Sequence, residues 1–291
     1  IINKVYTAKY YACPSPIISG MGVSEIEKFL NFFHKCKNKP GKILEVACFD
    51  GYVLEKIIKR KWDAYGCDPS SMTDIAIKRL GKKRIKKVFF EKGAYPKGSF
   101  DFIIFRNLLS LIYKPNLFLK TVNETLSENG KIFIDLPNFK EIIKLGGFGL
   151  FFHQHVSYFT LKSLNNLLVR NNFQITNYTE GKPNLFVEAT KVEKNSKTII
   201  KNYDLRILKK LSKKSKNIRS KVLNYFENNK INKIILFGAS AISTTIMGIL
   251  NDKQKEKIVL FVDNDLEKQG KYLSGSKFQI KSPKEIKKTN F

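Results

Sequence analysis

The chain has 291 residues, of which 43% are hydrophobic, so it is long enough for two domains with buried cores. No apolar run reaches about 18 residues and the N-terminus lacks the pattern of a signal peptide, which argues against a membrane span and against secretion. The four cysteines form no C-x-x-C pair, which disfavours a zinc site, and a chain of this size without a disulfide framework fits the reducing cytoplasm.

The net charge of +28 has two explanations. It is either the footprint of a polyanion such as RNA, DNA or anionic lipid, or a lysine-rich composition on a solvated surface. Basic residues are spread along the whole chain, with moderate clusters at 82–87 and 208–221, and aromatic residues are not interleaved with them. We therefore favour the solvated surface over a nucleic-acid partner, which the charge alone does not exclude, and the charge can still attract an anionic small substrate.

The hydrophobic pattern predicts alternating strands and helices. An opening helix over 24–36 precedes strands at 43–48, 63–67, 87–90, 101–105 and 131–135, with helices at 52–61, 72–80 and 116–127 between them. Such alternation is typical of an α/β fold with a parallel sheet covered by helices on both faces. After a short helix, a helix over 161–171 and two strands at 173–180 and 184–192 complete the predicted sheet.

A change in composition separates two domains. Residues 194–229 are rich in lysine and contain no Gly or Pro, which predicts one or two long exposed helices. A new strand–glycine–helix pattern follows and predicts a smaller, truncated Rossmann-like domain. We therefore expect an N-terminal segment and helix (1–36), a cofactor-binding domain (37–192), a helical linker (193–230) and a C-terminal nucleotide-fold-like domain (231–291).

The first strand-to-helix junction indicates a ligand site. Glu45 ends the apolar strand pattern, and Asp50 and Gly51 open the following helix, whose N-terminus favours polar ligand groups. Asp68 and Pro69 follow the next strand, where a carboxylate can accept hydrogen bonds from both hydroxyls of a ribose. Ala47 and Phe49 occupy glycine places of the dinucleotide fingerprint G-x-G-x-x-G, so a nucleoside without a diphosphate fits better than NAD.

These motifs resemble a known family. "ILEVACFDGYVL" (43–54) and "GCDPS" (66–70) resemble motifs I and II of class I S-adenosylmethionine (SAM) methyltransferases. Two later segments, 99–112 and 126–138, resemble the fourth and fifth strands of that family. The resemblance covers roughly residues 40–190 and implies a Rossmann-like methyltransferase sheet with SAM as the cofactor.

The resemblance also assigns roles to residues. It implies that Glu45, Ala47 and Gly51 lie against the methionine part of SAM and that Asp68 holds the ribose. Most members have Gly where Ala47 stands, and the extra methyl group crowds the loop. The full set of expected cofactor-binding residues is Glu45, Ala47, Asp50, Gly51, Asp68, Pro69, Gly93 and Ala94 near the adenine, and Arg106 and Asn107 beside the cofactor and the acceptor.

A narrower resemblance concerns the substrate. "FFHQHVSYFTLKSL" (151–164) is similar to the Y-H-E-H-x-x-Y-F segment of sugar-nucleotide C-methyltransferases. Residues 235–280 resemble the C-terminal domain of these enzymes, and "YYACPSP" (10–16) resembles the segment before their cofactor domain. This sequence shows no counterpart of their upstream zinc domain, and its C-terminal domain is shorter than theirs.

This resemblance implies a chemistry. A base removes the proton beside a 4-keto group of a nucleotide-linked deoxysugar, and the enolate carbon then attacks the methyl group of SAM. His155 matches the family histidine, and an imidazole suits a base near neutral pH. Gln154 stands in place of the family Glu and Phe152 in place of its Tyr; Tyr158, Tyr10 and Tyr11 are candidate substitutes for that Tyr. His153 completes the catalytic candidates.

Several alternatives stay open. The two histidines at 153 and 155 can also be structural loop residues, and without a neighbouring acid we predict no metal site there. Gln154 also fits O- or N-methylation of a sugar on the same scaffold. The positive charge suggests an RNA methyltransferase, although no RNA-binding appendage is recognisable. Ala47 and Gln154 allow a degenerate fold that serves as a non-catalytic binding subunit.

Overall fold

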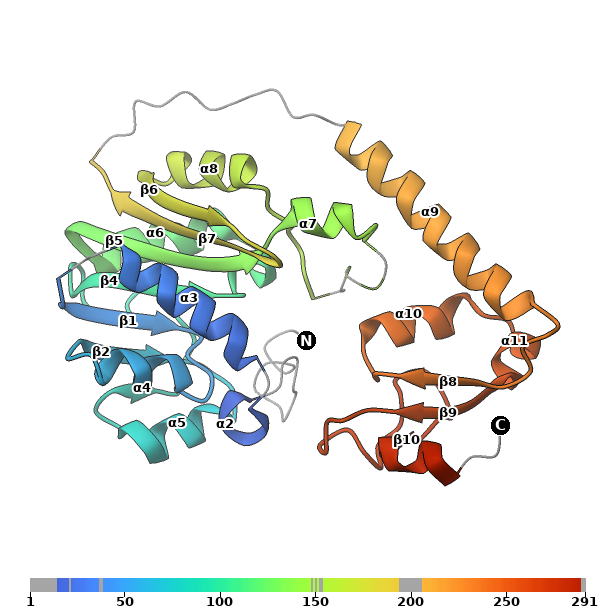
Figure 1. Cartoon of the computed structure of the whole chain (residues 1–291). Helices are drawn as coiled ribbons and strands as arrows, with labels where there is room; N and C mark the ends of the chain where they lie inside the picture. Colours follow the sequence, from blue (N-terminus) through green and yellow to red (C-terminus); the bar gives the residue numbers. More distant parts are fainter. Residues whose placement is uncertain are drawn as a thin grey trace. The chain divides into compact units, whose positions relative to one another are not determined.

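The computed structural model describes residues 15–20, 22–36, 39–147, 149, 151, 154–193 and 206–288 (Figure 1). The chain divides into two compact units. The first comprises Ile1–Phe139 and Gln154–Asn202, and the second comprises Lys140–His153 and Tyr203–Phe291. The segment 140–153 therefore belongs with the C-terminal residues, although the sequence analysis places it inside the cofactor-binding domain.

The first unit is built around a seven-stranded sheet. Its strands are β1 (Lys42–Val46), β2 (Asp63–Cys67), β3 (Ile85–Lys86), β4 (Phe100–Arg106), β5 (Leu126–Pro137), β6 (Phe173–Glu180) and β7 (Asn184–Lys191). Its helices are α2 (Pro16–Ser19), α3 (Val23–Lys35), α4 (Tyr52–Ile58), α5 (Thr73–Leu80), η1 (Leu109–Leu111), α6 (Pro115–Thr125) and α8 (Leu161–Arg170).

The strand order β3-β2-β1-β4-β5-β7-β6 confirms the predicted class I methyltransferase sheet. The strands from β3 to β5 are parallel, and β7 runs antiparallel to both β5 and β6. From β1 the chain first adds β2 and β3 on one side of that strand, and then crosses over to add β4 and β5 on its other side. This reversal creates the crevice at the carboxyl ends of β1 and β4 where such sheets bind ligands.

Helices cover both faces of this sheet, as the alternating pattern predicts (Figure 1). One face packs against α3, α4 and α5, and the other against α6 and α8. On the α3 face, Phe33 meets Phe133 edge to face at 4.7 Å, and Phe29 meets Phe186 at 5.8 Å. These aromatic contacts fix α3 against the sheet and so determine where its N-terminal turn lies.

Two predicted boundaries are wrong. The strand predicted at 87–90 is Ile85–Lys86, and the residues after it leave the sheet. The predicted helix at 116–127 ends at Thr125, and β5 begins at once because Leu126 pairs with Phe100 of β4. Both errors arise from pairing partners distant in sequence, which an apolar run does not reveal.

The elements of the second unit are α7 (Phe139–Lys144), α9 (Arg206–Glu227), β8 (Ile234–Phe237), α10 (Ala241–Ile249), α11 (Asp252–Glu256), β9 (Ile258–Val262), β10 (Ile280–Lys281) and η2 (Pro283–Lys288). Its three strands form a parallel sheet of order β10-β9-β8, which confirms a smaller C-terminal α/β sheet. The glycine turn at Gly146 and Gly147 packs against α9, because a Cβ at Gly147 would lie 2.8 Å from Cδ1 of Leu211. Among the described residues, no helix is long and apolar enough to cross a membrane.

Candidate active site

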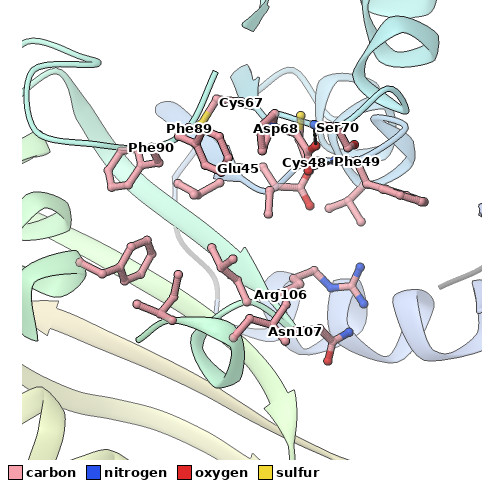
Figure 2. A pocket seen from close by; sticks show the side chains of 18 of the residues that line it. Glu45, Cys48, Phe49, Cys67, Asp68, Ser70, Phe89, Phe90, Arg106 and Asn107 are labelled. Atoms are coloured by element: carbon pink, nitrogen blue, oxygen red, sulfur yellow. Dashed lines mark hydrogen bonds between the residues drawn. The ribbon is translucent and has the colours of Figure 1, made fainter. Parts of the chain in front are cut away.

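A cavity of about 950 Å³ opens in the first unit at the carboxyl ends of its parallel strands. Its wall combines the turns after β1 and β2, the segment 88–92, the residues after β4, and the first turns of α3 and α6. Figure 2 shows the turn residues Glu45, Phe49 and Asp68 on one side and Arg106 and Asn107 on the other.

The turn from β1 to α4 has an unusual backbone. Ala47, Phe49 and Gly51 all have left-handed conformations, with φ of 61°, 51° and 76°. The amides of Ala47 and Cys48 both donate to the carbonyl of Cys67, at 2.8 and 3.2 Å, which ties the turn to β2. The backbone thus folds closely around the cavity, and only Gly51 avoids the usual steric cost of such a conformation.

Two buried aspartates hold this turn. The carboxylate of Asp50 accepts from the hydroxyl of Ser15 at 2.6 Å and from the amide of Tyr52 at 3.1 Å. The carboxylate of Asp68 accepts from the amides of Phe49 at 3.2 Å and Ser70 at 2.7 Å. A carboxylate has about four acceptor positions, so Asp68 keeps capacity for ligand hydroxyls.

A polar row crosses the sheet on its α3 face. Glu45 pairs with Ile104 across β1 and β4, so Arg106, two residues further along, leaves the sheet on the same face as Glu45. Asp135 of β5 is the register partner of Arg106. Asn184 of β7 reaches back to Asp135, where its side-chain amide donates to Oδ1 at 2.6 Å. We call these residues the polar row: Glu45, Arg106, Asp135 and Asn184.

Arg106 is held firmly within the polar row. Its Nε and Nη2 lie 2.9 and 2.8 Å from Oδ2 of Asp135, and its guanidinium stacks 5.1 Å from the ring centre of Phe29. Its side chain is only 13% exposed. A guanidinium held by both a carboxylate and an aromatic face has a fixed orientation.

Glu45 is the unusual acid of the row. Its side chain is buried, and its Oε2 has no hydrogen-bond partner among the described residues. The pKa of Glu45 is raised to about 8, chiefly by burial; Arg106 opposes the rise, and nearby Asp50 and Asp68 contribute to it. A buried acid with a strongly raised pKa inside a cavity marks a candidate ligand-binding site.

The opposite part of the wall is apolar. Phe90 packs edge to face on Phe118 at 5.8 Å and lies against Tyr95 at 6.4 Å. Phe89 and Leu111 also line the cavity. A surface of aromatic and aliphatic side chains suits a flat, largely apolar group such as a nucleobase.

The structure brings most of the predicted cofactor residues to this one wall. Gly51 caps α4 without lining the cavity, and Gly93 and Ala94 also lie outside the lining. The segment 88–92 lines the cavity where Gly93 and Ala94 were expected. The predicted residues that do line it are Glu45, Ala47, Asp50, Asp68, Pro69, Arg106 and Asn107.

The sequence analysis misses several residues of the site. Asp135 and Asn184 join Arg106 only through the register of three strands, which no local pattern encodes. Phe89 and Phe90 are hidden in the apolar run that predicts a strand. Glu25 lines the cavity from α3. In the sequence it reads as an ordinary exposed acid on the polar face of an amphipathic helix.

The predicted catalytic segment adjoins the cavity without lining it. The amides of Val156 and Ser157 both donate to the carbonyl of Ser110 in η1, at 2.9 and 3.2 Å. His155 is half-buried and its ring lies 5.6 Å from that of Tyr158; burial lowers its pKa. The cavity wall does not include Gln154, His155 or Tyr158. It does include Ile112, the residue that follows η1. His153, Phe152, Tyr10 and Tyr11 lie outside the described residues.

The described residues contain no group of three or more His, Cys, Asp or Glu side chains arranged to hold a metal ion.

Comparison with known families gives two matches. Residues 22–178 match the family model described as a methyltransferase domain. Residues 230–291 match a model described as C2185-like, N-terminal. No curated protein sequence matches the chain.

Solved structures resemble the first unit in fold. The PH0226 protein from Pyrococcus horikoshii OT3 is 17% identical, with a TM-score of 0.52 over 65% of this chain and 96% of that one. A SAM-dependent methyltransferase from Aquifex aeolicus is 19% identical, with a TM-score of 0.45 over 58% and 90%. The Burkholderia thailandensis 1,6-didemethyltoxoflavin-N1-methyltransferase, with bound 1,6-didemethyltoxoflavin and S-adenosylhomocysteine, is 14% identical, with a TM-score of 0.48 over 60% and 83%.

Proposed function

We propose that this chain, which belongs to the family of methyltransferase domains, transfers a methyl group from SAM bound in the cavity of its first unit. One observation carries the proposal. Asp68 at the end of β2 and the unpartnered Glu45 at the end of β1 line the same cavity as the apolar 88–92 wall. These three features match a ribose, an amino-acid group and an adenine in one ligand.

Each part of the wall has a task in this proposal. Asp68 accepts hydrogen bonds from the ribose hydroxyls while its bonds to Phe49 and Ser70 keep it in place. Phe89, Phe90 and their neighbours exclude water from the adenine. SAM supplies an activated methyl group on sulfur, so the protein has to orient the acceptor and, where needed, remove its proton.

For the acceptor, we propose a nucleotide-linked deoxysugar or related glycan precursor that is methylated on carbon. The similarity of residues 151–164 to sugar-nucleotide C-methyltransferases supports this assignment. The amides of Val156 and Ser157 bind the carbonyl of Ser110 in η1, whose last residue, Leu111, lines the cavity, so these two residues lie near it. His155 is the proposed base, and its lowered pKa keeps the imidazole neutral and able to accept a proton at pH 7.

O- or N-methylation of a sugar is a second candidate. It is favoured by the position of Gln154, His155 and Tyr158, none of which lines the cavity. Oxygen and nitrogen acceptors require less base strength than a carbon acid, so positioning contributes more of the rate enhancement.

The test uses methyl-labelled SAM with two acceptor pools, nucleotide sugars that include 4-keto-6-deoxy forms, and RNA. We expect label in the sugar pool, and NMR of the product distinguishes a C-methyl from an O- or N-methyl group. Label in RNA would instead identify RNA as the acceptor and assign the positive charge a role in binding it. Failure of the folded chain to bind SAM would contradict the proposal as a whole.

His155→Ala tests the proposed base, with His34→Ala, a half-buried histidine of α3 that does not line the cavity, as the matched control. Loss of general-base catalysis lowers the rate of transfer by about 100- to 10,000-fold. Without SAM, the wild-type protein is also expected to exchange the proton beside the keto group with deuterium from solvent. If His155→Ala keeps that exchange, another residue is the base.

A further inference from the structure

The second unit concentrates positive charge on its long helix α9 (Figure 1). This helix contains eight basic residues and one acidic residue, Glu227, whereas the whole chain has 53 basic and 25 acidic residues. A lysine-rich composition explains the charge of the chain in general, but it does not explain eight basic residues for a single acid. The basic residues of α9 are all exposed: Arg206, Lys209, Lys210, Lys213, Lys214, Lys216, Arg219 and Lys221.

Helical geometry places five of these lysines on one side of α9. Lys209, Lys213 and Lys216 are spaced i, i+4 and i+7, so they form one row on the helix surface. Lys210 and Lys221 each lie within about a quarter turn of Lys213 around the helix axis. These five lysines are the basic face of α9, and the face is about 18 Å long from Lys209 to Lys221.

The apolar side of α9 is already covered within the second unit. Leu211 packs against the turn at Gly147. Ile218 packs against Gly146 in the same turn, and Phe226 is buried in the core of the small sheet. These three side chains project from the side of α9 opposite the basic face. A protein groove that binds the apolar side of a basic helix is therefore a poor candidate for the partner.

The protein does not neutralise the charges of the basic face. Lysines elsewhere lie beside carboxylates, as Lys28 does beside Glu25 at 2.7 Å and Lys131 beside Glu188 at 3.0 Å. In the part of the chain that the structure describes, no carboxylate forms an ion pair with the five lysines of the basic face. Like charges within about 18 Å repel one another, so an anionic surface that approaches them is attracted.

The side chains of this face favour a layer of lipid headgroups over a nucleic acid. Phosphates of RNA and DNA are typically held by arginine forks, and bases by aromatic or amide side chains. The basic face consists of lysines, which act as point charges and require no fixed geometry of the anion. A cluster of four to eight basic residues on an amphipathic helix is typical of binding to anionic lipid.

We propose that the basic face of α9 binds the surface of a membrane that contains anionic phospholipid, without insertion of apolar side chains. Each lysine held near such a surface raises the partition coefficient about fivefold. The attraction extends over about 10 Å at 0.1 M salt and about 3 Å at 1 M salt, so it is strongly salt-dependent. The inference is independent of the proposed function, because it concerns the second unit and is measured without SAM.

The experiment is co-sedimentation of the full chain with vesicles of phosphatidylcholine, alone or mixed with phosphatidylglycerol. We expect binding only to the mixed vesicles at about 0.1 M salt, and release at about 1 M salt. Lys209→Gln/Lys213→Gln/Lys216→Gln removes three charges from the face and is expected to lower the partition coefficient about 100-fold. Glutamine is a good helix former, so α9 is expected to stay folded, which far-UV circular dichroism checks.

A matched variant separates the basic face from the charge of the whole chain. Lys82→Gln/Lys83→Gln/Lys97→Gln removes the same number of charges from exposed positions of the first unit, and two of them belong to the basic cluster at 82–87. This variant is expected to bind the mixed vesicles within about threefold of wild type, because its charges lie outside the proposed surface.

Three results would overturn the proposal. Equal loss of binding in the two triple variants would assign the attraction to net charge. Absence of binding to the mixed vesicles, or equal binding to both kinds of vesicle, would exclude an anionic membrane as the partner. Fluorescence anisotropy with single-stranded and duplex RNA tests the other polyanion. RNA binding that requires Lys209, Lys213 and Lys216, in a chain that does not bind vesicles, would assign the basic face to nucleic acid.

Discussion

Glu45 shows how a single residue can link ligand binding to protonation. Most buried carboxylates accept several hydrogen bonds, as Asp50 and Asp68 do here. Glu45 does not, and burial raises its pKa from 4.5 to about 8. In the ligand-free protein near pH 7, Glu45 is therefore mainly protonated.

The first prediction concerns stability. Between about pH 4.5 and pH 8 the unfolded chain releases the Glu45 proton while the folded chain keeps it, so the free energy of unfolding falls as pH rises. Glu45→Gln removes this dependence and is expected to be more stable than wild type at pH 8, by up to several kcal/mol, at about 1.4 kcal/mol per unit of pKa difference. Thermal denaturation of wild type and Glu45→Gln at pH 5 and pH 8 measures this difference in stability. The same pH dependence in both proteins would show that Glu45 is ionised.

The second prediction concerns SAM binding. If ionised Glu45 takes the α-ammonium group, binding at pH 6 must release the Glu45 proton. Affinity then rises with pH toward about pH 8, by at most about tenfold per pH unit, and falls above it because the α-ammonium group of SAM loses its own proton. Calorimetry in buffers of different ionisation enthalpy measures the released proton. Glu45→Gln is expected to bind more weakly and without this pH dependence, and a pH-dependent variant would point to another group.

At the scale of the elements, substitutions at two positions of the turn between β1 and α4 are expected to change stability in opposite directions. A Cβ on Gly51 would lie 2.9 Å from Cδ1 of Leu80 and 3.1 Å from Cβ of Ala76, at a φ of 76°. Gly51→Ala is therefore expected to destabilise by about 1–3 kcal/mol. Ala47 already bears a Cβ at a φ of 61°, so Ala47→Gly is expected to stabilise by up to about 1 kcal/mol.

Chemical denaturation of both turn variants measures these changes. The two signs must differ, because one variant adds a methyl group to a left-handed residue and the other removes one. Destabilisation by both variants would show that the side chain of Ala47 contributes more by packing than its backbone conformation costs.

The sequence predicts the elements of this fold better than it predicts how they meet. The run from Ile43 to Val46 and the capped helix after it are local signals, and the structure confirms both. The short β3 is different, because only its pairing with Gly66 and Cys67 determines where it lies. The same distinction holds at the site. Glu45 and Asp68 follow from local patterns, whereas the bond from Asn184 to Asp135 depends on which strands are neighbours.

At the scale of the whole molecule, the cavity and the chain's division lead to a prediction about truncation. All residues that line the cavity lie between Pro16 and Asn184 and belong to the first unit. A chain that ends at Asn202 is therefore expected to bind SAM within a few-fold of the full chain. Such a chain keeps the segment 140–153 without α9, against which Gly146 and Gly147 pack, so lower solubility is expected.

Calorimetry and size-exclusion chromatography of the shortened chain test this. Loss of SAM binding by a folded, monomeric fragment would show that the second unit contributes to the cofactor site. Aggregation that is relieved by restoring residues 203–291 as a separate chain would agree with the division described here.

The polar row also has a consequence for the order of synthesis. The ribosome completes Glu45, Arg106 and Asp135 long before Asn184, which is the last member of the row in the chain. Until β7 emerges, Oδ1 of Asp135 lacks the side-chain amide that binds it in the finished protein. A nascent chain stalled before residue 184 thus has every strand of the parallel half of the sheet and the Arg106–Asp135 ion pair, but lacks the hydrogen bond from Asn184. The chain is then expected to become able to bind the cofactor late in translation, when the β6–β7 hairpin joins the sheet.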